Sequence, residues 1–130
     1  MGSILFILFV DQGVKLLFLD YFPQRIRVNS GWGFGVFPGY NFYWALLAIL
    51  VFAITLIYWI HHLQERKLDW LGWFLGAILS NLIDRISYGG VIDIQVNPYL
   101  PAVNFADLVL TVLFLSLICG KIGLFYDEKD

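Results

Sequence analysis

The chain has 130 residues, of which 60% are hydrophobic and only 14% charged, and its mean hydropathy is +0.77. A soluble domain of this length hides only part of so much apolar surface, so the composition excludes an ordinary soluble enzyme and predicts an integral membrane protein. The formal net charge of −2 offers no basic surface for nucleic acid. The one cysteine, Cys119, cannot form an internal disulfide.

Four apolar stretches predict four membrane-spanning helices, at roughly 4–22, 42–60, 68–88 and 103–125. The second, "FYWALLAILVFAITLIYWI", has the length of about 20 residues that crosses a hydrocarbon core of about 30 Å, and it carries no formal charge. Backbone polar groups find no water in lipid, so each span must be helical. We therefore expect an all-α integral membrane protein, a four-helix bundle forming one membrane domain over residues 1–130.

The connecting segments follow from this topology. Four spans place both termini on one side of the membrane and leave segments 23–41 and 89–102 on the other. Lys and Arg number four on the side of the termini and three on the opposite side, which favours cytoplasmic termini. Segment 23–41 begins with alternating residues ("RIRV") and continues with glycines, a pattern that predicts a small extracytoplasmic β-like platform, a short strand or hairpin, between the first two helices.

Several polar residues interrupt the spans. Asp11 and Lys15 lie four residues apart on one helical face, and Asn81, Asp84 and Arg85 share a face by similar spacing. An ionisable residue inside a span costs at least about 2.5–3.5 kcal/mol on insertion scales, so it usually faces the bundle interior or a wet cavity. We expect Asp11, Lys15 and Asp84 to be structural, with Arg85 able to hold Asp84.

Two further carboxylates, Asp93 and Asp107, have no adjoining cation in the sequence. The predicted topology brings both to the outer membrane boundary. One interpretation is an acid/base pair; the other is a solvated loop Asp and an Asp that stabilises a helix N-terminus. The residues alone leave both interpretations open.

Five blocks of the sequence, in this order, resemble the lipoprotein signal peptidase family (signal peptidase II, four-span aspartyl peptidases of bacterial membranes). They are "DQGVK" (11–15), "NSGWGFG" (29–35), "GAILSNLIDR" (76–85), "VIDI" (91–94) and "VNFAD" (103–107). The chain departs from the family pattern at Ser80, where Gly is usual, and at Ile94 and Val103, where Phe is usual. Every charged position of the pattern is present.

The resemblance implies a catalytic pair, Asp93 and Asp107, and a substrate-binding set: Asn29, Gly31, Asn81, Arg85 and Asn104. Two close carboxylates share one proton, so one acts as base while the other acts as acid. The implied substrates are diacylglyceryl-modified prolipoproteins, cut on the N-terminal side of the lipidated cysteine. The resemblance further implies a monomer in the bacterial cytoplasmic (inner) membrane, in contact with lipid and needing no metal or other cofactor.

A different class of function remains as the alternative. Asp11 with Lys15, and Asp84 with Arg85, could form the relay of a small proton-coupled transporter subunit. Such a protein is expected to show repeat symmetry between its halves, and residues 1–65 and 66–130 share no motif.

Overall fold

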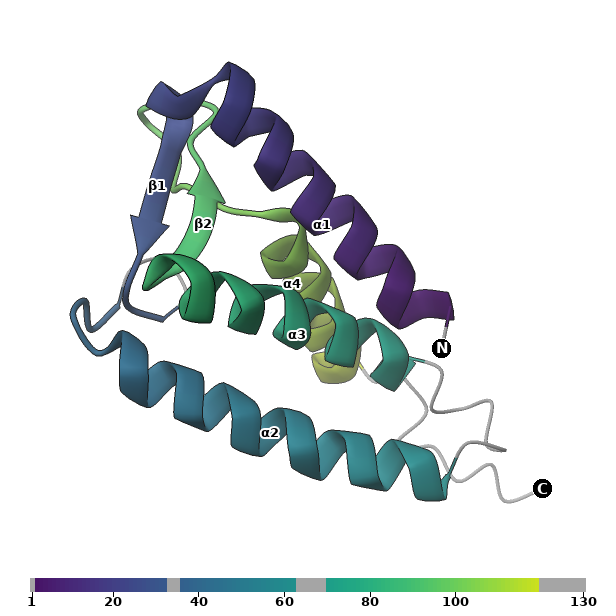
Figure 1. Ribbon diagram of the computed structural model, residues 1–130. Helices are drawn as coiled ribbons and strands as arrows, with labels where there is room; N and C mark the ends of the chain where they lie inside the picture. Colours follow the sequence, from purple (N-terminus) through teal and green to yellow (C-terminus); the bar gives the residue numbers. More distant parts are fainter. Residues whose placement is uncertain (1, 33–35, 63–69, 120–130) are drawn as a thin grey trace.

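The computed structural model describes residues 2–32, 36–62 and 70–119, and most of them are helical (Figure 1). The elements, in chain order, are α1 (Gly2–Tyr21), a 3-10 turn (Pro23–Arg25), β1 (Ile26–Asn29), α2 (Asn41–His61), α3 (Trp70–Tyr88), β2 (Val91–Ile94) and α4 (Phe105–Ile118). The bounds of α1, α2 and α3 lie within two residues of the predicted stretches, whereas α4 begins two residues later than predicted and ends at Ile118, before the predicted end at 125. Residues 68–69 of the predicted third span and 120–125 of the fourth lie outside the described residues.

Two of these helices, α1 and α2, are long and apolar enough to cross a membrane by length and hydropathy. Helix α3 does not pass the same test because its C-terminal half holds Asn81, Asp84 and Arg85. The described part of α4 is apolar but has only 14 residues. Large side chains on the outer faces, such as Phe9, Ile54 and Phe114, are more than half exposed, as expected of surfaces that meet lipid.

Helix α3 is the centre of the bundle and packs against α1, α2 and α4 (Figure 1). Trp59 of α2 meets Leu71 and Leu75 of α3 in one apolar cluster, and Ile7, Ala77 and Ala106 form a second where α1, α3 and α4 converge. The approach of α1 to α3 depends on Gly76. A Cβ there would lie 2.9 Å from Cβ of Ile7 and 3.1 Å from the backbone of Ile4.

A two-stranded antiparallel sheet closes one end of the bundle (Figure 1). β1 pairs with β2 in a register that sets Arg27 opposite Asp93 and Asn29 opposite Val91. The predicted strand in segment 23–41 is confirmed, but the all-α class and the hairpin within that segment need correction. The partner strand comes from segment 89–102, because β1 needs an external partner for its backbone N–H and C=O groups. The segment "VIDI" has only four residues, which is too short for a strand to be predicted from its hydrophobic periodicity.

Candidate active site

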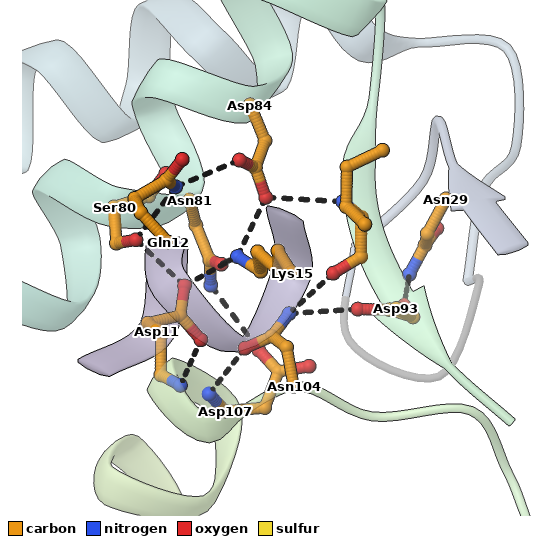
Figure 2. Close-up of polar contacts among 12 residues, drawn as sticks. Asp11, Gln12, Lys15, Asn29, Ser80, Asn81, Asp84, Asp93, Asn104 and Asp107 are labelled. Carbon is orange, nitrogen blue, oxygen red and sulfur yellow. Dashed lines mark hydrogen bonds and ion pairs between the residues drawn. The ribbon is translucent and has the colours of Figure 1, made fainter. Parts of the chain in front are cut away.

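Asp93 lies in the middle of β2, with its side chain on the same face of the sheet as Asn29. Its carboxylate is 3% exposed and accepts two hydrogen bonds from neutral amides. Nδ2 of Asn104 donates to Oδ1 at 2.7 Å, and Nδ2 of Asn29 donates to Oδ2 at 3.3 Å (Figure 2). The pairing of β1 with β2 therefore places Asn29, a predicted substrate-binding residue, in contact with Asp93, a predicted catalytic residue.

Asp107 lies in the first turn of α4, and the side chain of Asn104 caps this helix. The Asn104 backbone is extended, and its Oδ1 accepts from the backbone N–H of Asp107 at 2.8 Å, the usual role of Asn at a helix N-cap. Because its Nδ2 simultaneously donates to Asp93, one buried amide side chain joins the two predicted catalytic residues (Figure 2). The oxygen and the NH₂ group of the Asn104 side chain therefore both have hydrogen-bond partners within the protein.

The surroundings of Asp93 alter its ionisation. Burial, and then the negative charge of the nearby Asp107, raise the pKa of Asp93 from its ordinary value of 3.8 to about 7. The hydrogen bonds from Asn104 and Asn29 and the positive charge of Lys15 act in the opposite direction but are smaller effects. A carboxyl group that titrates near neutral pH can both hold and release a proton under physiological conditions.

Asp107 has its own amide partner. Nδ2 of Asn81 donates to Oδ1 of Asp107 at 3.2 Å, and Oδ1 of the same amide accepts from Nζ of Lys15 at 3.3 Å. The half-buried Asn81 thus stands between the lysine and this carboxylate (Figure 2). The positive charge of Lys15 is close to the candidate pair without contacting it.

A buried ion cluster lies behind the two carboxylates. Lys15 contacts Oδ2 of Asp11, as predicted, and also Oδ2 of Asp84 at 2.6 Å. No other ion pair occurs among the residues that the structure describes, 2–32, 36–62 and 70–119. Asp93 and Asp107 therefore have no ion-pair partner within those residues. Gln12 and Ser80, which sequence reasoning did not select for the site, complete the cluster: Gln12 donates to both Ser80 and Asp84, and Ser80 donates to Asp11.

Arg85 does not hold Asp84, and that expectation is wrong. Its Nη2 donates to the carbonyl of Gly31 at 2.6 Å and its Nη1 donates to Oδ1 of Asn41 at 3.0 Å. Nδ2 of Asn41 in turn donates to the carbonyl of Arg85. Arg85 therefore ties the segment after β1 and the start of α2 to α3. Asn41 was not predicted, because it lies in none of the sequence blocks.

The predicted site residues therefore gather at the sheet end of the bundle. Asn29, Asn81 and Asn104 contact the two carboxylates directly, whereas Gly31 enters through its backbone carbonyl bound to Arg85. Trp32 is 59% exposed and packs against Trp44, while Phe34 of the same sequence block lies outside the described residues. Within the part of the chain that the structure describes, no three His, Cys, Asp or Glu side chains are grouped as metal ligands.

Comparisons with known proteins show which family the chain resembles. The family model described as signal peptidase (SPase) II matches residues 3–123. A lipoprotein signal peptidase of Syntrophomonas wolfei is 30% identical over 92% of this chain and 93% of its own length. One of Halothermothrix orenii is 30% identical over 80% of this chain and 81% of its own. One of Pseudomonas fluorescens is 37% identical over 72% of this chain and 61% of its own.

A solved structure described as a bacterial membrane enzyme has the same fold. It superimposes with a TM-score of 0.70 at 19% sequence identity and covers 98% of this chain and 91% of its own. The matched family model spans nearly the whole chain, including the segments that hold Asp11, Asn29, Asp84, Asp93 and Asp107. The chain therefore belongs to the signal peptidase II family of bacterial membrane proteases.

Proposed function

We propose that this protein is an aspartic endopeptidase that removes the signal peptide from diacylglyceryl-modified prolipoproteins, cutting N-terminal to the lipidated cysteine. The curated relatives are lipoprotein signal peptidases, and this substrate class is carried over from them. The observation that carries the aspartic mechanism is the link through Asn104, which donates to the carboxylate of Asp93 and accepts from the backbone N–H of Asp107, with no ion-pair partner for either carboxylate among the described residues. The family supports this function over the proton-coupled transporter.

The pair can perform the hydrolysis with one shared proton. The ionised carboxylate takes a proton from a water molecule, whose oxygen attacks the scissile carbonyl carbon. The protonated carboxyl hydrogen-bonds the developing oxyanion, and a proton then passes to the leaving amine as the C–N bond breaks. The raised pKa of Asp93, about 7, supports a pair that retains one proton at neutral pH. The proton belongs to the pair, and the acid and base roles follow its location.

The arrangement of the helices supports four membrane crossings with the site on the outer side. Helix α1 ends, α2 begins and α3 ends at the sheet end of the bundle, and α4 begins deeper inside the bundle, beside Asp11 of α1, and runs away from that end (Figure 1). This alternation is what four successive crossings produce. We propose that this end faces away from the cytoplasm, with cytoplasmic termini in the inner membrane, and that the monomer receives its lipid-anchored substrate sideways from the bilayer.

The test is cleavage of a diacylglyceryl-modified prolipoprotein by purified variants. We expect Asp93→Asn and Asp107→Asn each to lower kcat by at least about 10³-fold, because removing one member of a catalytic unit costs nearly its whole contribution. The matched control is Asp20→Asn, a change of the same chemistry at an exposed position near the end of α1, which should cleave normally. Near-normal turnover by either dyad variant, correctly folded, would show that the catalytic assignment is wrong.

A further inference from the structure

Two buried carboxylates outside the candidate catalytic pair make the same kind of contact with the backbone. Oδ1 of Asp11 accepts from the N–H of Ala106 at 2.9 Å, and Oδ2 of Asp84 accepts from the N–H of Ile92 at 3.1 Å (Figure 2). Ala106 immediately precedes Asp107, and Ile92 immediately precedes Asp93. Each catalytic carboxylate is therefore preceded in the chain by a backbone amide that another carboxylate holds.

Lys15 joins these two contacts into one unit. Its Nζ contacts Oδ2 of Asp11 and Oδ2 of Asp84, and all three side chains are at most 2% exposed. We call Asp11, Lys15 and Asp84 the frame. Because α1 supplies two of its members and α3 the third, the frame connects the two central helices to β2 and to the start of α4.

The two amides are suited to this use. The N–H of Ala106 belongs to the first turn of α4, where backbone donors have no intrahelical acceptor, and a carboxylate there also meets the positive end of the helix dipole. The N–H of Ile92 is bound to Asp84 of α3, which fixes β2 against that helix. A charged acceptor holds an N–H more strongly than a neutral one, so both contacts restrain the backbone.

We infer that Asp11 and Asp84, joined by Lys15, are positioning residues of the peptidase: they set the distance between Asp93 and Asp107 by holding the backbone amide that precedes each. This inference rests on the proposed function, because it assigns the frame a role in positioning the proposed catalytic residues. A purely stabilising ion cluster would not need to bind these two amides. The inference predicts that loss of the acceptors together with the charges lowers kcat much further than loss of the charges alone.

Two triple variants separate acceptors from charges. Asp11→Asn, Lys15→Met and Asp84→Asn together remove every charge of the frame but retain a side-chain oxygen for each amide. Asp11→Leu, Lys15→Met and Asp84→Leu remove the charges and the acceptors. Both sets leave no unpaired buried charge, and replacement of a buried ion cluster by apolar residues is often tolerated.

The readouts are kcat and KM for a lipid-modified prolipoprotein, with the melting temperature in detergent measured on the same samples. We expect the leucine set to have a kcat about 100-fold below that of the asparagine set at similar KM, since a misplacement of about 1 Å costs about that factor. Equal kcat values, or kcat values that simply follow the melting temperatures, would overturn the inference.

A second variant covers the case in which the leucine set does not fold. Replacing Ala106 by lactic acid converts its amide to an ester, which deletes the N–H bound to Asp11 and leaves all three charges in place. We expect at least a tenfold loss of kcat with KM unchanged, and an unchanged kcat would refute the inference. The matched control is Thr55→Val, which removes a 2.7 Å hydrogen bond to the carbonyl of Val51 within α2, away from the frame, and should stay within about threefold of the wild type.

Amide hydrogen exchange tests the frame independently of the catalytic assignment. The N–H groups of Ile92 and Ala106 should be protected in the wild type and in the asparagine set, and should exchange at least tenfold faster in the leucine set. If this pattern holds while Asp93→Asn and Asp107→Asn remain active, the frame exists but the proposed catalytic pair fails. If exchange at both amides is the same in the two sets, the frame itself is refuted.

Discussion

Replacing Asp93 by Asn should stabilise the fold at pH 8, although it abolishes cleavage. Burial and the charge of Asp107 raise the pKa of Asp93 from 3.8 to about 7. Below pH 3.8 the carboxyl is protonated in both the folded and the unfolded chain and contributes no difference in stability. Between pH 3.8 and 7 the unfolded chain releases the proton while the folded protein keeps it, so the free energy of unfolding falls as pH rises.

The magnitude follows from the same values. A pKa difference of about 3.2, at 1.36 kcal/mol per pH unit, destabilises the wild type by about 4 kcal/mol once the pH exceeds 7. Asn avoids this cost, but its NH₂ group replaces one of the two acceptor oxygens, so one of the donors from Asn29 and Asn104 loses its partner at a cost of about 1–2 kcal/mol. We therefore expect a net gain of about 2–3 kcal/mol at pH 8 and none at pH 4.5.

The assay is unfolding by increasing SDS in mild detergent, followed by tryptophan fluorescence at both pH values. The exposed Asp20→Asn control should leave the free energy of unfolding unchanged at both. A variant of Asp93 that gains equally at pH 8 and pH 4.5, or gains only at pH 4.5, would refute the reasoning, because neither result can come from a carboxyl that is protonated in the fold and ionised outside it.

Three further predictions concern the site and its supports. The cleavage rate at low substrate concentration should fall as pH rises above about 7, because Asp93 then loses its proton and the pair with Asp107 can no longer supply an acid; a flat pH–rate profile from 6 to 9 would contradict this. Lys15→Ala should lower the melting temperature more than Asp11→Ala, because loss of Lys15 leaves two buried carboxylates unpaired, whereas loss of Asp11 leaves Lys15 paired with Asp84; a lower melting temperature for Asp11→Ala would contradict the pairing. Gly90→Ala should lower the free energy of unfolding by about 1–3 kcal/mol and reduce cleavage, because its Cβ would lie 2.7 Å from a backbone oxygen of β1; unfolding and cleavage like those of the wild type would show that the strands have room to separate.

The helices could be predicted from the sequence because each coincides with a long, predominantly apolar stretch, a pattern typical of membrane proteins. The prediction of 42–60 for α2 differs from the observed Asn41–His61 by one residue at each end. The pairing of β1 with β2 could not be predicted in the same way. It joins segments more than 60 residues apart, and a four-residue strand carries too little periodicity to identify its partner.

The candidate site likewise contains residues that the sequence predicted and contacts that it did not. Its sequence blocks identified Asp93, Asp107 and the three asparagines that contact them, because these residues lie in recognisable motifs. The partner of Asp84 was mistaken, since adjacent residues of a helix point in directions about 100° apart and do not face one another. Asp84 consequently points to Lys15 of α1, while Arg85 reaches Asn41 of α2.

The distribution of charged and neutral partners has a chemical consequence. The cations on α1 and α3 are used elsewhere: Lys15 is bound between Asp11 and Asp84, and Arg85 holds a backbone carbonyl. A cation in contact with either carboxylate of the proposed pair would favour its ionised form strongly and oppose the return of a proton. Neutral amide donors orient a carboxylate with a smaller bias toward ionisation, so a pair held by Asn29, Asn81 and Asn104 keeps its geometry while the proton moves. The buried charges of Asp11, Lys15 and Asp84 can then hold the backbone at the residues that precede Asp93 and Asp107. They do so without deciding which of these two carboxylates is ionised.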